Sequence, residues 1–405
     1  MKGAILMNNS QIVELTHRNL VDIYGCLPIA LVRGQGSYLE DADGNRYLDF
    51  FCGLAVTNLG HSHPRLVRAV QDQSERLMHV SNIFHTEPTA RLAAHLASRF
   101  GDGRVFFGNS GAEANEAAIK LARRWGHKDG GGRYEILATL GSFHGRTLAT
   151  LSATGQEKYH QGFQPLVPGF RMAPFDDLAA FERSLSDNTV AVMIEPIQGE
   201  GGVVVPRADY LKRVREFCDR NHLLMILDEI QVGVGRTGRF FAYEHSGVKP
   251  DIVTLAKALG GGLPLGAMIA KGDVAASLTP GSHGTTFGGN PVSCAAGLAL
   301  VEALDEERVL ENATRVGGAM LERVREIART CDRIKEVRGL GMIIGVVLKH
   351  DARPVVDACL KERLLVNATA GNVLRLLPPL NLSRAEADQG LAIVERALRT
   401  APVPS

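Results

Sequence analysis

Between residues 104 and 270 the sequence alternates short apolar runs with amphipathic stretches, and this alternation restricts the fold more than any other feature. One amphipathic stretch, AEANEAAIKLARRW (112–125), places Ala114, Ala117, Ala118, Leu121 and Trp125 on one face of a helix. Strands that alternate with helices form a mostly parallel sheet covered by helices, an α/β fold that binds ligands at the carboxyl ends of its strands. The apolar runs are RVFF (104–107), EILATL (135–140), VAVMIE (190–195), LLMILD (223–228), DIVTL (251–255) and LGAMIA (265–270).

The two ends of the chain follow other patterns. Near the N-terminus, Asp43-Gly44 separates two apolar-aromatic segments, which predicts an antiparallel hairpin. After Asn290-Pro291 a helical region continues to about residue 330, followed by strand candidates in EVRGLG, MIIGVVL, LLVNAT and VLRLL and by helices near 354–364 and from Ser383. We therefore predict a large ligand-binding domain at 61–290 and a smaller α+β domain at 291–405. The N-terminal segment 1–60 is expected to become part of the smaller domain.

Charge and composition favour a small-molecule partner. The 405 residues include 45 Lys and Arg against 44 Asp and Glu, so no large basic field exists to attract nucleic acid or anionic lipid. The six cysteines are scattered without a C-x-x-C pair, which indicates reduced thiols. The apolar run in MKGAILMNNSQ is too short for a signal peptide, and no run is long enough for a membrane span, so we expect a cytoplasmic protein.

The segment LLMILDEIQVGVGRTG (223–238) allows three interpretations. An apolar strand that ends in Asp228-Glu229 is typical of an NTPase, but the phosphate-binding string G-x-x-x-x-G-K-[ST] does not occur. The G-x-G-x-x-G spacing of Gly233, Gly235 and Gly238 matches a dinucleotide fingerprint, but it begins five residues after the strand and no helical pattern follows it. In the third interpretation Asp228 faces a different cofactor.

Lys257 supports the third interpretation. It is the only charged residue between Asp251 and Lys271, at the end of an apolar strand and close to three glycines. A lysine there either extends its amine to water or is desolvated, and a desolvated amine can form a Schiff base with a carbonyl compound such as pyridoxal phosphate (PLP).

PLP needs a phosphate site, an acid at its pyridinium nitrogen and a flat surface against its ring. GNSGAEANE (108–116) supplies free backbone N–H groups at a helix start, although an ordinary capped helix has the same sequence pattern. Asp228 is the candidate acid, and Phe143 in GSFHGRT is the candidate ring cover.

Seven strings in order show that the chain resembles the class III, fold-type I PLP-dependent aminotransferases over nearly its whole length. They are FFGNSGAEANEAAIKLAR, GSFHGRTLAT, EPIQGEGG, LDEIQVGVGRTG, TLAKALGGG, HGTTFGGNP and LRLLPPL. No single string is sufficient, but the ordered set is highly specific. The resemblance implies transfer of an amino group from N2-acetyl-L-ornithine to 2-oxoglutarate, a step of arginine biosynthesis that gives N-acetyl-L-glutamate 5-semialdehyde and L-glutamate.

The resemblance also implies cofactor-binding residues. Lys257 matches the Schiff-base lysine, which also carries the proton between substrate and cofactor. Asp228 matches the partner of the pyridinium nitrogen, and Gln231 the side chain near the phenolic oxygen. Thr286 matches a threonine that reaches the cofactor phosphate of the neighbouring subunit, which implies a homodimer with shared active sites. The other expected cofactor contacts are Ser110, Gly111, Ala112, Phe143, Glu229 and Ile230.

On the substrate side, Arg146 matches an arginine that binds a substrate carboxylate, and Arg375 matches a second one. Glu200 matches a glutamate that pairs with the second arginine while the amino donor is bound. Thr285 occupies a position near the acylated part of the substrate where close relatives often carry Ser. Ala112 stands where many relatives have Thr or Ser, so it offers the phosphate only its backbone N–H.

Several alternatives remain open at this level. Within the family the rivals are ornithine, succinylornithine, succinyl-diaminopimelate and 4-aminobutyrate aminotransferases, and outside transamination a PLP aminomutase. An aminomutase has no second dicarboxylate substrate, so the pairing of Arg375 with Glu200 argues against it. His61 and His63 form an H-x-H pair without further spaced ligands, so we predict no metal site.

Overall fold

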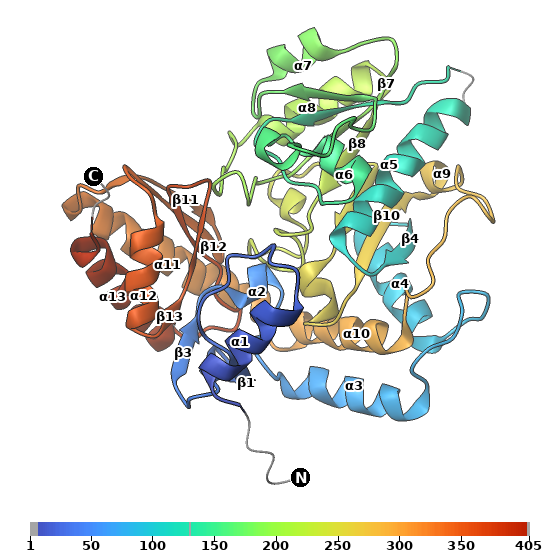
Figure 1. Cartoon of the computed structure of the whole chain (residues 1–405). Coiled ribbons are helices and arrows are strands. Elements are labelled where there is room, and N and C mark those ends of the chain that lie inside the picture. The colour runs from blue at the N-terminus through green and yellow to red at the C-terminus, as the bar shows by residue number, and fades with distance from the viewer. Residues whose placement is uncertain (1–6, 129–130, 403–405) are drawn as a thin grey trace.

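A seven-stranded sheet forms the centre of the computed structural model, which describes residues 7–128 and 131–402 (Figure 1). Its strand order is β4-β10-β9-β8-β7-β5-β6. The pairs from β9 to β6 are parallel, whereas β10 is antiparallel to both β4 and β9, so the prediction of a mostly parallel α/β sheet is confirmed. The bounds are β4 Gly103–Gly108, β5 Glu135–Thr139, β6 Phe170–Ala173, β7 Thr189–Ile194, β8 Leu224–Asp228, β9 Ile252–Leu255 and β10 Gly266–Lys271.

Both faces of this sheet are covered because successive residues of each strand point to opposite sides. In β8, Leu224 and Ile226 pack with the buried alanines of α5 (Gly111–Lys128), whereas Met225 and Leu227 belong to the core on the other side. The predicted helix at 112–125 is therefore present and faces the sheet with small side chains, which let it approach closely. The other helices of this region are α2 Cys52–Ala55, α3 Pro64–Arg76, α4 Glu87–Phe100, α6 Leu148–Ala153, α7 Leu178–Ser184, α8 Tyr210–Arg220, α9 Gly272–Ala275 and α10 Pro291–Glu306.

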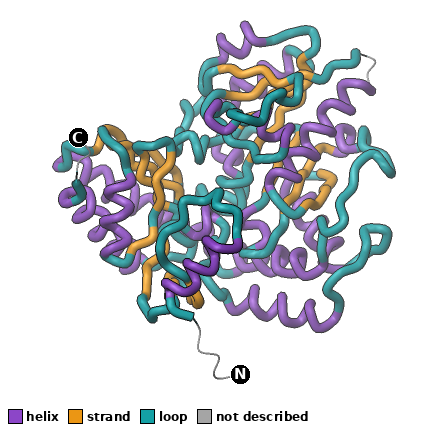
Figure 2. Tube along the Cα trace, in the orientation of Figure 1, coloured by secondary structure: helices purple, strands orange, loops and turns teal. Residues whose placement is uncertain are grey.

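Two smaller sheets lie beside the large one, at the left of Figure 2. One has the order β11-β12-β15-β14, and the other the order β1-β2-β3-β13. The second sheet joins the two ends of the chain, since β3 of the predicted N-terminal hairpin pairs in parallel with β13. The domain limits at residues 60 and 290 remain predictions. The elements are α1 Asn9–Asn19, β1 Leu31–Gln35, β2 Tyr38–Asp41, β3 Arg46–Asp49, α11 Val309–Thr330, β11 Ile334–Leu340, β12 Ile343–Leu348, α12 Arg353–Lys361, β13 Leu364–Leu365, β14 Asn367–Thr369, β15 Val373–Leu376 and α13 Arg384–Thr400.

The glycine-rich loop after β8 connects these parts through Arg236. This arginine is fully buried and donates from Nη1 to the carbonyl oxygens of Met342, at 3.0 Å, and Pro378, and from Nη2 to Asn58 Oδ1. Gly238 has φ +88°, and a β-carbon there would lie 2.3 Å from Thr314 Oγ1. The glycine spacing that resembles a dinucleotide fingerprint therefore belongs to a contact between parts of the fold.

Two kinds of feature, membrane-spanning helices and metal sites, are absent from the described residues. None of their helices combines the length and apolar character needed to cross a membrane. No group of three His, Cys, Asp or Glu side chains among them is arranged to hold a metal ion.

Candidate active site

A cavity of about 260 Å³ lies where four parallel strands end. Because β5, β7, β8 and β9 are parallel, the loops after them meet at one edge of the sheet. The cavity is lined by Gly111, Ala112, Phe143, His144, Gly145, Arg146, Glu195, Glu200, Asp228, Ile230, Gln231 and Lys257. Most of the residues expected from sequence therefore meet in one space.

Asp228, the last residue of β8, is held by donors from three different segments. Its Oδ2 accepts from Asn115 Nδ2 at 2.8 Å and lies 2.7 Å from His144 Nδ1, and its Oδ1 accepts from the backbone N–H of Ile230 at 3.0 Å. Asn115 is fixed in turn, because its Oδ1 accepts from Thr254 Oγ1 at 2.7 Å. Asp228 is 4% exposed, so this carboxylate is buried and cannot change its orientation easily.

Lys257 follows β9 and begins a short 3-10 helix, Lys257–Gly260. Its φ is +45°, a region that costs a residue other than glycine roughly 1–3 kcal/mol. Burial lowers the pKa of its amine below the usual value, and the negative charges of Glu200 and Asp228 partly oppose this. The lysine is therefore strained, desolvated and placed among carboxylates, which suits an amine that must lose its proton.

Glu200 and Arg375 form an ion pair across two sheets of the fold. Arg375, in β15, is fully buried and donates from Nη1 to Glu200 Oε1 at 2.7 Å and to Gln231 Oε1 at 3.1 Å. Gln231 Nε2 donates to Glu200 Oε1 at 3.3 Å. Burial raises the pKa of Glu200, but the charges of Arg375 and Lys257 outweigh it and hold this pKa below its ordinary value. A β-carbon at Gly199 would lie 1.9 Å from Gln231 Oε1, so this close arrangement requires glycine there.

Arg375 has a hydrogen-bond donor that no described residue uses. Its Nε donates to Asn367 Oδ1 at 3.3 Å, while its buried Nη2 has no partner among the described residues. A buried guanidinium nitrogen without an acceptor costs free energy until an acceptor arrives. The Arg375 guanidinium can therefore donate to a further acceptor.

The start of α5 has the features of an anion site. Ser110 Oγ accepts from the backbone N–H of Glu113 at 3.2 Å, which is ordinary capping, whereas Gly111 and Ala112 line the cavity at the positive end of an 18-residue helix. A β-carbon at Gly111 would lie 2.8 Å from Ile230 Cδ1, so glycine is also needed for packing.

Arg146 is exposed beside two aromatic rings. Its guanidinium carbon lies 4.1 Å from the centre of the Tyr159 ring and 5.4 Å from that of Phe143. The two rings contact each other edge to face, with their centres 5.7 Å apart. The positive charge of Arg146 therefore lies at the mouth of the cavity, against the two rings and without a carboxylate partner among the described residues.

Five predicted site residues lie outside the cavity lining: Ser110 and Arg375, described above, and Glu229, Thr285 and Thr286. Glu229 is fully buried, and its carboxylate accepts from the backbone N–H groups of Ala242 and Tyr243. Thr285 Oγ1 accepts from Asn109 Nδ2 at 3.3 Å, and Thr286 is exposed next to Phe287. Any contact of these residues with the cofactor or substrate stays a prediction, and for Thr286 it concerns a second subunit.

The sequence interpretation assigned no role to Asn115, His144, Glu195 or Tyr159. Glu195 Oε1 accepts from the Phe143 N–H at 3.0 Å and its Oε2 from the Gly199 N–H at 3.1 Å, so it joins two loops of the cavity wall. Burial raises the pKa of Glu195 to about 7, opposed by the nearby His144. Asn115, His144 and Glu195 lie within the seven family motifs, whereas Tyr159 does not. A motif gives the order of residues but not the direction of a side chain.

The donor set fits a flat, phosphorylated pyridine aldehyde. The cavity offers an amine, a buried carboxylate, a helix start and an aromatic side chain in one space. His144 Nε2 is buried and unpartnered among the described residues, so His144 has no second acceptor that would draw it away from Asp228. These observations agree with the PLP expected from sequence.

The chain is similar to known proteins over nearly its whole length. The model of the family "Aminotransferase class-III" matches residues 23–398. An acetylornithine aminotransferase from Methanocaldococcus jannaschii is 47% identical over 94% of this chain and 96% of that protein. The solved structure of an acetylornithine aminotransferase from Elizabethkingia anophelis is similar with a TM-score of 0.87 and 32% identity, over 97% of this chain and 100% of that one. An ornithine aminotransferase from Toxoplasma gondii, whose active site holds PLP at partial occupancy, gives a TM-score of 0.94 and 34% identity over 97% and 95% of the two chains.

Proposed function

The chain belongs to the class-III aminotransferases, and from this we propose that it uses PLP to transfer the terminal amino group of N2-acetyl-L-ornithine to 2-oxoglutarate. The products are N-acetyl-L-glutamate 5-semialdehyde and L-glutamate, as in arginine biosynthesis. The observation that carries the proposal is the meeting of Lys257, Asp228 and the pair of Arg375 with Glu200 around one cavity. Relatives named for this activity at more than 40% identity over nearly the whole chain support the substrate.

PLP, when bound, supplies an electron-withdrawing ring that stabilises negative charge on the substrate carbon. Asp228 would hold a proton on the ring nitrogen, because Asn115 and His144 keep its carboxylate oriented in a buried site. The N–H groups of Gly111 and Ala112 would bind the phosphate, and Phe143 would cover the ring. Lys257 would first bind the aldehyde carbon and then, once released, would move the proton at the substrate's terminal carbon.

In the first half-reaction Arg146 would bind the α-carboxylate of acetylornithine at the mouth of the cavity. The donor carries only this carboxylate, so Glu200 can remain on Arg375 and the second arginine stays neutralised. Thr285 would lie near the acetyl group, from a loop that Asn82 fixes by donating to the carbonyl oxygens of Thr285 and Gly288.

In the second half-reaction the acceptor is a dicarboxylate and needs both arginines. Arg146 would bind the distal carboxylate of 2-oxoglutarate, and Arg375 its α-carboxylate after Glu200 moves away. The unpartnered Nη2 of Arg375 supports this exchange, because a bidentate carboxylate would use both terminal nitrogens of the guanidinium.

We also propose a homodimer that acts in the cytoplasm. Several large apolar side chains are exposed around Thr286: Met78 by 66%, Ile83 by 83%, Phe84 by 64% and Phe287 by 59%. Several exposed large apolar side chains are typical of an interface, and a second copy of this chain would cover them. Thr286 would then reach the cofactor phosphate of the other subunit.

The first experiment replaces Lys257 by Ala. The variant should lose the yellow absorbance of the bound cofactor and the covalent adduct that borohydride traps, while Lys212→Ala, on the exposed side of α8, keeps both. A borohydride adduct on another lysine of the Lys257 variant would show that the assignment is wrong.

The second experiment measures single-turnover bleaching of the cofactor band with acylated and free ω-amines. Acetylornithine should bleach it fastest; a faster reaction with ornithine or 4-aminobutyrate would overturn the substrate assignment while leaving transamination intact. Arg375→Ala should slow the 2-oxoglutarate half-reaction far more than the acetylornithine half-reaction, and equal losses would contradict the proposed roles of the two arginines.

A further inference from the structure

A second, larger hollow of about 700 Å³ lies along α5 and the segment that follows α9, away from the active site. The active site uses residues 111–115 at the start of α5, whereas this hollow follows the second half of the helix, roughly 15–25 Å from its first residue. We call it the basic groove. It is lined by Lys120, Arg123, Arg124, His127, Lys128, Ala276, Ser277, Leu278, Thr279 and Ser282.

The five basic side chains share one face of the helix. Positions 120, 123, 124, 127 and 128 follow the i, i+3, i+4, i+7, i+8 spacing that places residues on one side of an α-helix. The opposite side of α5 carries the buried alanines that pack on the sheet. The basic charge is thus concentrated by the helix geometry, in a chain whose net charge is only +1.

No carboxylate of the described residues forms an ion pair with these side chains. Within residues 7–128 and 131–402, none of the five basic side chains forms an ion pair, whereas Arg65, Arg99 and Arg215 each pair with at least one carboxylate. The acids whose charges act on this region are Glu113 and Glu116, and the Glu116 carboxylate, one turn before Lys120, accepts from the hydroxyl of Thr147. Repulsion among the four charges of Lys120, Arg123, Arg124 and Lys128 is therefore not offset by an ion pair within the described residues.

The two arginines are fixed rather than free in solvent. Arg124 Nε donates to the Ser277 carbonyl at 2.6 Å and its Nη2 to Thr279 Oγ1 at 3.0 Å. Arg123 Nη2 donates to the Pro168 carbonyl at 2.6 Å, and its guanidinium lies 5.3 Å from the centre of the Phe170 ring. Carbonyl and ring contacts orient a guanidinium without removing its charge, so less entropy is lost when an anion binds.

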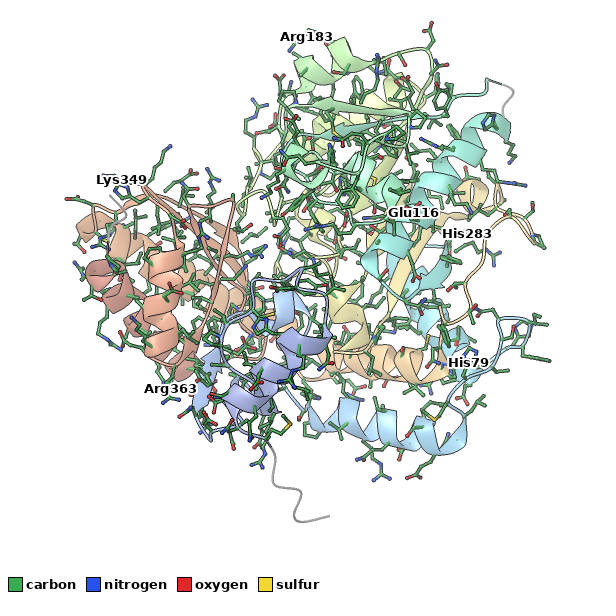
Figure 3. All side chains as sticks on the ribbon, viewed as in Figure 1. His79, Glu116, Arg183, His283, Lys349 and Arg363 are labelled. Atoms are coloured by element: carbon green, nitrogen blue, oxygen red, sulfur yellow. The ribbon has the colours of Figure 1, made fainter. Side chains whose placement is uncertain are left out.

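Two further features suit an anion with several oxygens. Arg123 Nε and Ser277 Oγ are buried without a partner among the described residues, whereas the hydroxyls of Thr279 and Ser282 already bond to Arg124 and to the Thr279 carbonyl oxygen. Lys120 Nζ contacts His283 Nδ1 at 2.9 Å, on the loop that Figure 3 labels beside Glu116. Burial and the charge of Lys120 lower the pKa of His283, so its neutral imidazole can accept a hydrogen bond from the Lys120 amine group.

We propose that the basic groove binds a small molecule that carries a chain of phosphate groups. Spaced cations along about two helical turns suit several linked anionic groups better than a single carboxylate. Leu278 and Ala276 add an apolar surface on which an attached organic group can rest. This site is separate from the phosphate position at the start of α5 and does not depend on the proposed transamination.

The test is calorimetric titration of the PLP-loaded enzyme, so that the active-site phosphate position is occupied. The probes are inorganic tripolyphosphate and, as the nucleoside-linked form of the same chain, ATP without magnesium. Lys120→Gln/Lys128→Gln removes two charges from the basic groove, and Lys212→Gln/Arg213→Gln removes the same number from the exposed side of α8. Neither pair takes part in the active site, so activity and melting temperature check that both variants fold.

We expect one tripolyphosphate per chain, bound more weakly at about 200 mM than at about 50 mM salt. The groove variant should lose about tenfold or more in affinity, and the α8 variant less than about twofold. If ATP binds more tightly than tripolyphosphate, the natural ligand is a nucleotide. If ATP binds more weakly, the natural ligand is a free polyphosphate.

Three results would overturn the proposal. The first is that neither probe binds saturably to the wild-type enzyme. The second is that the two variants lose equal affinity. The third is that a single-stranded oligonucleotide binds several copies of the protein, and more tightly than either probe binds. The first would mean that the charges only complement the negative end of the α5 dipole.

Discussion

Asp228 and Glu200 are both carboxylates of the same cavity, but the protein holds them in different ways. Every hydrogen-bond partner of Asp228 comes from elements of the seven-stranded sheet region: Asn115, His144 and the Ile230 N–H. Glu200 is held by Arg375, which comes from β15 of another sheet, and by Gln231.

The hydrogen bonds of Asp228 are therefore expected to be permanent, whereas the ion pair of Glu200 with Arg375 can be exchanged. Three donors from a single packed unit fix Asp228, so its charge can serve both half-reactions unchanged. Glu200 has a single charged partner whose Nη2 is still unpartnered, so a substrate carboxylate can replace it. The predictions below test this contrast.

The largest effect is expected for Asp228→Asn. Loss of the permanent charge should lower the rates of both half-reactions by about 10³-fold, because the ring nitrogen no longer keeps its proton. Single-turnover absorbance measures each half-reaction. Asp251→Asn, which breaks a partly buried pair with Arg215 and Lys271 outside the cavity, should lower stability with little change in these rates. Equal rate losses in the two variants would contradict the role of Asp228.

A smaller effect is expected for Asn115→Ala. It removes one donor to Asp228, and a buried hydrogen bond to a charged group contributes about 1.5–3 kcal/mol, so both half-reactions should slow by about 10- to 100-fold. Asn221→Ala, whose amide bonds to the Phe217 carbonyl at the end of α8, is the control and should change rates less than twofold. An effect confined to one half-reaction would argue against a permanent role for Asp228.

Glu200→Gln should act on one half-reaction only. A neutral amide holds Arg375 less strongly than a carboxylate does, so 2-oxoglutarate should compete better and its KM should fall by about 3- to 10-fold. The KM for acetylornithine should stay within about twofold. Steady-state kinetics with each substrate varied measures both, and a higher KM for 2-oxoglutarate would show that Glu200 is not a competitor.

The smallest effect concerns stability and the third buried carboxylate, Glu229. Burial raises its pKa to about 8 against the opposing effect of two backbone N–H donors, so the folded protein holds this proton more tightly than the unfolded chain. The resulting stabilisation is complete below the unfolded pKa and is lost as pH rises through the folded value. It should fall by about 1 kcal/mol between pH 7 and 8. Urea unfolding at both pH values measures it, and Glu229→Gln should show a smaller difference; an identical difference would assign the effect to other groups.

Much of the fold could be predicted from sequence because its signals are local. The six apolar runs correspond to strands β4, β5, β7, β8, β9 and β10, since a short apolar run with three to six buried residues, bounded by polar turns, leaves few alternatives. Strand β6, Phe170–Ala173, was not predicted, because its residues FRMA include an exposed arginine and show no continuous apolar run. The helical region from 291 to about 330 is two helices, α10 and α11, separated by Arg308 with φ +53°.

The candidate site could be predicted only as a set of residue types. Ordered motifs identified Lys257, Asp228, Glu200 and Arg375, and the cavity and its contacts bring these side chains together. They did not indicate that Glu229, next to Asp228, turns its carboxylate to the Ala242 and Tyr243 N–H groups instead. Alternate residues of a strand and its loop face opposite ways, and only packing selects which way.

The sequence alone determined the α/β class, the order of the strands along the chain and the identity of the reactive groups, because these depend on local periodicity and on motif order. The tertiary structure decided which residues act on one another across long separations. Asn115 reaches Asp228 across 113 positions and Arg375 reaches Glu200 across 175. It also decided that five basic residues of α5 have no carboxylate partner in the described chain. Hydrogen bonds and charges act over a few ångströms in space, and distance along the chain does not measure that separation.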